Sequence, residues 1–219
     1  MYGTANTMGV FAEVLGLCPF DSTTMLYCSS EKIRQARNVG EEIVRLVKEK
    51  LNARKFITKE SITNGIKHVS ATGGSTNFVM HVMAIAKAAG IDLTLDEFDE
   101  ISHSVPLIAK FKPSSQYNLF DYQNAGGVRA TLLSIRDDLN LNVPVVMGTT
   151  LKDKLESFNK PIDRTVIKEE VLLEAVPKIV ERGTKIPPSY IKPISGGRMS
   201  STFGGRKAPT KGASSNHKG

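Results

Sequence analysis

The chain has 219 residues, 40% of them apolar, which is enough for one large or two small domains with a buried core. Its formal net charge of +7 lies entirely in residues 183–219, because the first 182 residues carry 22 basic and 22 acidic side chains. The composition therefore excludes a basic nucleic-acid-binding body, a membrane-spanning helix, which needs about 18 consecutive apolar residues, and a disulfide framework, since the cysteines are Cys18 and Cys28 alone. The N-terminus lacks a secretion signal, so we expect a cytoplasmic protein.

The first predicted element is a helix over residues 31–51, directly after Ser29 and Ser30. Apolar side chains recur along it at helical spacing, and we expect this stripe to be buried: Ile33, Ala36, Ile43, Val44, Val47 and Leu51. Thr58 is a candidate cap for a second helix, which carries Ile62, Ile66 and Val69 towards the glycine pair at 73 and 74.

Two glycines and three capping residues follow, directly before an apolar helical segment that Gly90 closes: Gly73, Gly74, Ser75, Thr76 and Asn77. Glycine permits close backbone approach, and the three polar side chains can cap the first turn. Free backbone N–H groups at a helix start also attract anions, so this loop could hold a carboxylate or a phosphate. Ordinary cap chemistry is the alternative explanation.

The later elements mix helix with strand. Thr94 and Glu97 have capping-box spacing, and the helix that they begin must end before Pro106. A further helix is expected from Gly126 to about residue 139. Residues 143–147 are the best strand candidate, and another helix follows them. This alternation predicts an α/β fold, with helices flanking a mostly parallel sheet.

The composition changes at about residue 186. Prolines, glycines, serines and lysines replace the apolar residues, and such a segment cannot bury enough surface to offset its chain entropy. We therefore expect one domain over residues 1–185 and a disordered basic tail over residues 186–219. The alternative for the tail is a remnant of the start of a following domain.

Four separated motifs share an order and spacing: the run Gly3-Thr4-Ala5-Asn6-Thr7, the Gly-Gly loop at 73–77, residues 102–107 and Ala125-Gly126-Gly127-Val128. In these the chain resembles the dihydroxy-acid dehydratase and phosphogluconate dehydratase family, from residue 1 to about residue 155. The resemblance implies an iron–sulfur hydro-lyase that removes water from vicinal dihydroxy acids or sugar acids to give 2-keto acids. It also implies an α/β N-terminal domain and a homo-oligomer or a complementing dehydratase chain.

The resemblance further implies an iron–sulfur cluster and a divalent metal, Mg²⁺, whose ligands are not identifiable on this chain. In the family a cluster cysteine directly precedes the glycine and Thr-Ala-Asn run, which here begins at Met1. We therefore expect the central part of a dehydratase N-terminal domain, inactive on its own. No metal ligand and no catalytic residue is assigned.

The resemblance carries candidate residues over to matching positions near the substrate or the cluster: Thr4, Asn6, Thr7, Gly73, Gly74, Ser75, Thr76 and Asn77. Their hydroxyl and amide groups could orient substrate or cluster oxygens. His81 joins them because it lies one helical turn after Asn77, although a buried structural histidine fits the same position. We expect His68 to be exposed or peripheral and both cysteines to fill the core.

Two function classes stay open. The first is a dehydratase portion, with a small dihydroxy or sugar acid as its substrate. The second is a non-catalytic interaction protein or dehydratase-subunit partner, whose basic tail could bind nucleic acid. Nucleic acid is the weaker hypothesis, because Tyr190 and Phe203 are the tail's sole stacking groups.

Overall fold

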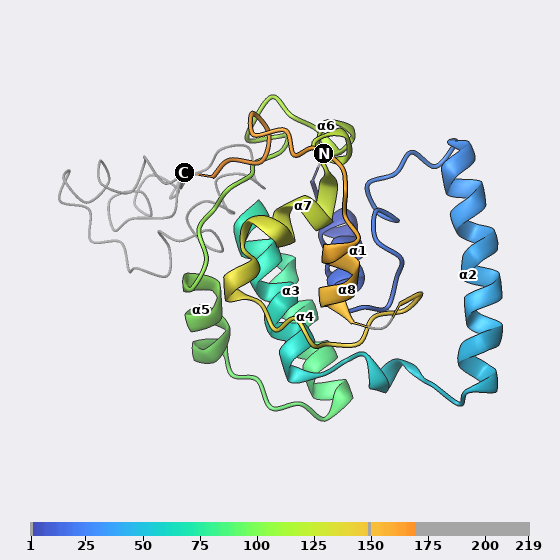
Figure 1. Cartoon of the computed structure of the whole chain (residues 1–219). Coiled ribbons are helices and arrows are strands. Elements are labelled where there is room, and N and C mark those ends of the chain that lie inside the picture. Colours follow the sequence, from blue (N-terminus) through green and yellow to red (C-terminus); the bar gives the residue numbers. More distant parts are fainter. Residues whose placement is uncertain (1, 149, 170–219) are drawn as a thin grey trace, which may run out of the picture.

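The computed structural model describes residues 2–148 and 150–169, in which ten helical segments follow one another (Figure 1). They are α1 (Thr4–Val14), α2 (Ser30–Lys48), η1 (Ala53–Lys55), α3 (Lys59–Thr72), α4 (Asn77–Ala89), α5 (Leu95–His103), α6 (Leu119–Asn124), α7 (Gly127–Ser134), η2 (Arg136–Asp138) and α8 (Leu151–Glu156). None of the helices in these residues is long and apolar enough to cross a membrane.

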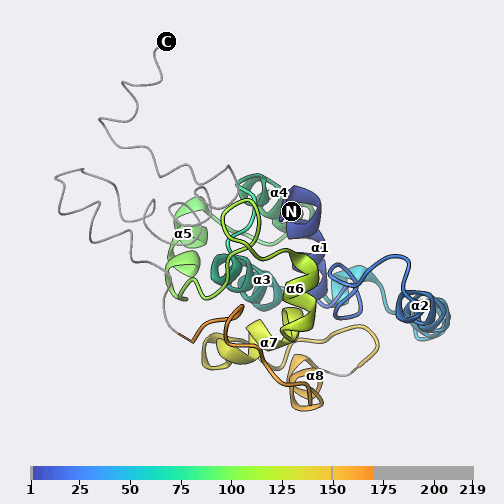
Figure 2. The same ribbon diagram turned by 90° about the horizontal axis from the view of Figure 1, so that it is seen from above.

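Helix α3 occupies the centre, with α1, α4, α5 and α7 packed around it (Figure 2). The approach of α1 to α3 depends on a glycine. A Cβ atom built on Gly65 would lie 2.4 Å from ring atoms of Phe11, so a larger residue would push the two helices apart. This close contact fixes where the N-terminus of α1 lies relative to the end of α3.

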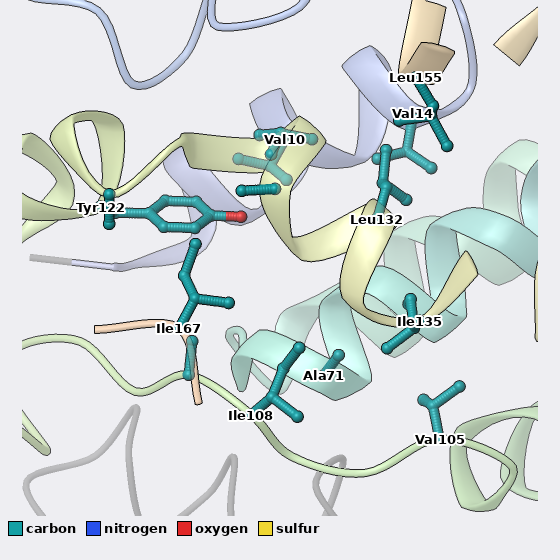
Figure 3. Packing of buried hydrophobic residues seen from close by; sticks show 14 of the residues in the cluster. Val10, Val14, Ala71, Val105, Ile108, Tyr122, Leu132, Ile135, Leu155 and Ile167 are labelled. Carbon is teal, nitrogen blue, oxygen red and sulfur yellow. The ribbon is translucent and has the colours of Figure 1, made fainter. Parts of the chain in front are cut away.

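Two larger clusters of buried side chains make up most of the core. One joins α1, α3, α6, α7 and α8 and includes Val10, Tyr122 and Leu132 (Figure 3). The other joins α1, α3, α4 and α5 through Phe11, Phe78 and their neighbours. Because α1 and α3 contribute to both clusters, these two helices hold the body together.

Several predicted helices are confirmed, and their starts follow local capping chemistry. Thr58 Oγ1 accepts a hydrogen bond from the backbone N–H of Ser61, and Thr94 Oγ1 accepts one from Glu97. Helix α5 ends at His103, before Pro106 as expected. Gly73 and Gly90 end α3 and α4 in the left-handed conformation that glycine adopts easily.

The predicted α/β fold is wrong. Residues 2–148 and 150–169 contain no strand and no sheet, and the single isolated bridge joins Pro144 to Thr150. Val143, Val145 and Val146 are buried, as their apolar character suggests, but Pro144 has no N–H to donate to a ladder. Met147 then takes a positive φ of 56°, which turns the chain back toward α8. A short apolar run indicates burial without distinguishing strand from buried loop.

The first predicted helix is confirmed as α2, but the expectation that its apolar stripe is buried is wrong. Ile33, Ile43, Val44 and Val47 are all exposed, and Leu46 alone in this helix is buried. Figure 1 shows α2 standing beside the body rather than within it. The expected tail over residues 186–219 and the domain limit at residue 185 lie outside the described residues.

Candidate functional site

Two of the sequence motifs meet at one end of the helical body. Thr4 lies in the first turn of α1, and Ser75 lies in the loop between α3 and α4, 71 residues further along the chain. Their hydroxyl oxygens are 2.8 Å apart, and the Asn77 side-chain amide donates to Thr4 Oγ1 at 3.1 Å. The close packing of α1 on α3 brings these groups together, which sequence spacing alone does not specify.

A second set of hydrogen bonds holds the loop between α3 and α4 against α1 at this junction. The backbone N–H of Ser75 donates to Thr7 Oγ1 at 3.1 Å, and that hydroxyl donates to the carbonyl of Gly3 at 2.9 Å. A Cβ atom built on Gly74 would lie 2.6 Å from Thr7 Cγ2. Glycine is therefore required at position 74 for the loop to lie against α1.

The junction joins the N-terminal ends of two helices. Gly3 precedes α1 without a side-chain cap, Thr76 makes no capping hydrogen bond at α4, and neither first turn carries an acidic residue. Ser75 Oγ instead accepts from the Asn77 N–H at 3.3 Å. The next N–H groups of α4 also have partners within the loop, since Phe78 N–H donates to the carbonyl of Ser75 and Val79 N–H to that of Thr76. The positive ends of the two helix dipoles favour a negative charge there. Hydroxyl and amide groups therefore lie together beside the positive ends of two helices.

The remaining candidates lie around this junction with less direct involvement. Gly73 forms the left-handed end of α3, and Asn6 is half-buried on α1. His81 is half-buried on α4, and no hydrogen bond within the described residues joins its ring to Thr4, Ser75 or Asn77. The functional roles of all nine residues stay predictions.

The implied iron–sulfur cluster and Mg²⁺ require ligands that the described residues do not supply. Across residues 2–148 and 150–169, no group of three or more histidine, cysteine, aspartate or glutamate side chains could hold a metal ion. The cysteines do not fill the core as predicted, because Cys18 is half-buried and Cys28 is exposed. The donor set of the junction, hydroxyls and an amide, does not fit a cluster that thiolates hold.

The sequence patterns did not predict that the carboxylate of Glu13 is buried. Glu13 is fully buried on α1 and accepts hydrogen bonds from the backbone N–H groups of Asp21 and Thr23 and from the Ser22 hydroxyl, at 2.6–3.0 Å. Burial raises the pKa of Glu13 to about 7, against the opposing effect of these donors. Its position between the buried Phe11 and Val14 was the available signal. All three donors come from one turn, so Glu13 anchors that turn to α1.

The prediction that His68 is peripheral is wrong. His68 is completely buried on α3, where Nε2 lies 3.1 Å from the Tyr122 hydroxyl, which is in turn 2.7 Å from Thr131 Oγ1. Burial lowers the pKa of His68 to about 3, so the ring is neutral. Tyr2 makes a comparable contact with Thr72 at 3.3 Å. Polar pairs of this kind tie the N-terminal segment and α6 to α3.

The helical domain, in which two sequence motifs meet at two helix ends, matches a known protein family. Residues 1–154 match the model of the dihydroxy-acid/6-phosphogluconate dehydratase N-terminal domain. The chain is a member of that family, in agreement with the resemblance seen in the four motifs.

Three relatives to which the chain is similar are each named dihydroxy-acid dehydratase. The chain is 40% identical over 153 residues to the mitochondrial dihydroxy-acid dehydratase of Saccharomyces cerevisiae, covering 69% of this chain and 26% of that protein. It is 40% identical over 168 residues to the dihydroxy-acid dehydratase of Thermodesulfovibrio yellowstonii, covering 75% and 30%. For that of Methanococcoides burtonii the values are 37% over 155 residues, 71% and 28%. The chain therefore spans less than a third of the length of these relatives.

Proposed function

We propose that this chain forms part of a hydro-lyase that dehydrates a vicinal dihydroxy acid or sugar acid, and that the junction of Thr4, Ser75 and Asn77 binds the substrate's oxygens. One observation carries the proposal: two family motifs 71 residues apart are hydrogen-bonded to each other at paired helix N-termini. Family membership supplies the reaction class.

The chemistry of the junction suits this substrate. A 2,3-dihydroxy carboxylate presents one anionic group and two hydroxyls, which match the positive ends of the helix dipoles and side chains that both donate and accept. Thr4 Oγ1 and Ser75 Oγ already contact each other, so a substrate hydroxyl could replace that contact without leaving either group unpaired. Their role in this proposal is to orient the substrate.

Two buried titratable groups, Glu13 and His68, take no part in the proposal. Glu13 and His68 are fully buried and lie against internal partners. The described residues hold no ligand set for a cluster or for Mg²⁺, so no step of the reaction is assigned through these groups. We propose that the chain alone does not turn over substrate.

A chimaera tests the proposal. Residues 1–154 would replace the matching segment of the Thermodesulfovibrio yellowstonii enzyme, and dehydration of a 2,3-dihydroxy acid would be followed as 2-keto acid released. We expect activity in the chimaera and none in the isolated chain. Thr4→Val and Ser75→Ala should each lower kcat/KM about 10- to 100-fold, the range for a lost hydrogen bond to a charged or strongly polar group.

Controls separate binding from folding. Thr63→Ala removes a hydroxyl that donates to the carbonyl of Lys59 on the outer side of α3, away from the four motifs, and it should leave kcat/KM unchanged. Circular dichroism and the thermal midpoint of each variant would show whether the fold is kept. A folded chimaera that is inactive, or one in which Thr4→Val and Ser75→Ala retain full kcat/KM, would contradict the proposed site.

A further inference from the structure

The hydroxyl group of Thr7 is fully occupied within the protein. Thr7 is completely buried on α1, whereas Thr4 is half-buried and Asn77 is exposed. A threonine hydroxyl has one proton to donate, and that of Thr7 goes to the carbonyl of Gly3 at 2.9 Å. The same oxygen accepts from the backbone N–H of Ser75 at 3.1 Å. Thr7 therefore has neither the exposure nor the free proton that contact with a substrate would need.

These two hydrogen bonds join the two sequence motifs. A helical threonine commonly donates to the carbonyl four residues before it, as Thr7 does to Gly3. The additional bond from Ser75 reaches across 68 residues of sequence. Gly3 directly precedes Thr4, and the Ser75 hydroxyl contacts Thr4 Oγ1. The places of both hydroxyls in the Thr4–Ser75 pair thus depend on where the Thr7 side chain lies.

The Gly3 end of this link is held against the body by the residue before it. The backbone N–H of Tyr2 donates to the carbonyl of Lys112 at 3.0 Å, and the Tyr2 hydroxyl lies 3.3 Å from Thr72 Oγ1. Tyr2 is also buried. The carbonyl of Gly3 is therefore a fixed acceptor, and it sets the direction of the Thr7 hydroxyl.

The Ser75 end of the link depends on Thr7 itself. Among the described residues, the buried N–H of Ser75 donates to Thr7 Oγ1 and to no other group. A buried N–H without an acceptor is costly, so removal of the Thr7 hydroxyl should make the loop move until this N–H finds a partner or solvent. The Thr7 methyl group fills the space beside Gly74, which leaves the loop no room to shift toward α1.

We propose that Thr7 is a positioning residue for the dehydration: its hydroxyl sets the places of Thr4 and Ser75 without touching the substrate. The inference rests on the proposed function of the Thr4–Ser75 junction and names the side chain on which the geometry of that junction depends.

Amide hydrogen exchange of the full chain, followed by NMR, tests the positioning without any enzyme activity. Thr7→Val keeps the shape of the side chain and removes its hydroxyl, so the Ser75 amide should exchange at least about tenfold faster. The nearby Gly73 amide donates to the carbonyl of Val69, and its rate should change less than about twofold. Thr7→Ser retains the hydroxyl and should keep the Ser75 amide protected.

Thr131→Val is the matched control. Thr131 is also completely buried on a helix, and its hydroxyl also has two partners, the Tyr122 hydroxyl at 2.7 Å and the carbonyl of Gly127 at 3.4 Å. Its loss should leave the ratio of the two amide rates unchanged. Thr7→Ala removes the same hydroxyl from a smaller side chain, and it provides the comparison if Thr7→Val does not fold.

Steady-state kinetics of the chimaera that carries residues 1–154 measures the effect on dehydration. Thr7→Val should lower kcat/KM about 10- to 100-fold, and Thr7→Ser should stay within about threefold of the parent chimaera. Because Thr7 acts through Ser75, Thr7→Val combined with Ser75→Ala should lose clearly less than the product of the two single losses. A threonine that only stabilises the fold would leave kcat/KM of the folded protein unchanged, as we expect for Thr131→Val.

Two outcomes would overturn the inference. They are an unchanged ratio of amide rates in Thr7→Val, and losses in kcat/KM that multiply independently when Thr7→Val and Ser75→Ala are combined. A folded but inactive chimaera would overturn the proposed function and, with it, the role of Thr7 in dehydration. The amide rates would then still decide whether Thr7 fixes the loop.

Discussion

Helices α2 and α3 differ in which of their side chains they bury against the body of the protein. Helix α3 buries five polar side chains, Ser61, Asn64, His68, Ser70 and Thr72, along with its apolar ones. Helix α2 exposes its apolar stripe and uses polar groups to contact the body. Both show helical periodicity in the sequence. Periodicity thus predicts that a helix forms, whereas its neighbours decide which residues are buried.

The largest expected effect compares one substitution in the two helices. Ile66 on α3 is completely buried, and Ile43 on α2 is 54% exposed. Ile66→Ala should lower the free energy of unfolding by about 2–5 kcal/mol, because it removes packed volume and leaves a cavity. Ile43→Ala should lower it by less than about 0.5 kcal/mol in dilute, monomeric protein. Urea denaturation of both variants at about 1 µM measures the difference. Equal losses would mean that α2 is packed as tightly as α3.

A glycine pair sharpens the comparison. Gly65→Ala on α3 would force a Cβ atom to 2.4 Å from the Phe11 ring, and we expect it to cost about 1–3 kcal/mol. Gly40→Ala on α2 meets no atom within 4 Å and should add about 0.5–1 kcal/mol through helix propensity. Thermal unfolding of dilute protein should show a lower midpoint for Gly65→Ala and a higher midpoint for Gly40→Ala. A destabilised Gly40→Ala monomer would argue against an open α2 backbone.

The buried histidine of α3 predicts a pH dependence. The pKa of His68 falls from 6.5 to about 3 on folding, so the unfolded chain binds the extra proton and stability is lost as pH falls below 6.5. The slope is about 1.4 kcal/mol per pH unit. The pKa of Glu13 rises from 4.5 to about 7, so its contribution has the opposite sign and is lost as pH rises between those values. The two nearly cancel between pH 4.5 and 6.5.

The His68 effect should therefore appear below pH 4.5. In the parent chain the free energy of unfolding should fall on the acid side with the slope of about one proton, roughly 1.4 kcal/mol per pH unit. His68→Gln should remove most of that slope. Urea denaturation at several pH values measures it. Glu13→Gln is the complementary variant: without the opposing contribution of Glu13, stability should rise with pH up to about 6.5 instead of staying nearly level between pH 4.5 and 6.5. An unchanged acid slope in His68→Gln would show that another group controls acid unfolding.

The smallest effect is expected on the surface of α2. Arg45 contacts Glu42 and Glu49 at 2.6 Å each, and 41% of its side chain is exposed to solvent. Arg45→Ala should shift the thermal midpoint only slightly, and the shift should vanish in about 1 M salt because solvent and ions screen the pair. A salt-independent loss would indicate that Arg45 also holds α2 against the body through Glu42.

Much of the helix pattern was predictable because its signals are local. Thr58 and Thr94 begin α3 and α5, and Pro106 limits α5, through contacts within a few residues. The predicted helix from Gly126 to about residue 139 is realised as α7 and η2. The strand at residues 143–147 was not realised, since a sheet needs distant partners and the described residues offer none.

The sequence by itself determined the family, the helix starts and the residues that could form a site. Its four motifs identify the dehydratase N-terminal domain, and caps act through neighbouring backbone groups. Only the tertiary structure decided that Thr4 meets Ser75, that His68 is buried and that the α2 stripe faces outward. Contacts and burial depend on residues far apart in the chain, and local spacing carries no information about which of them become neighbours.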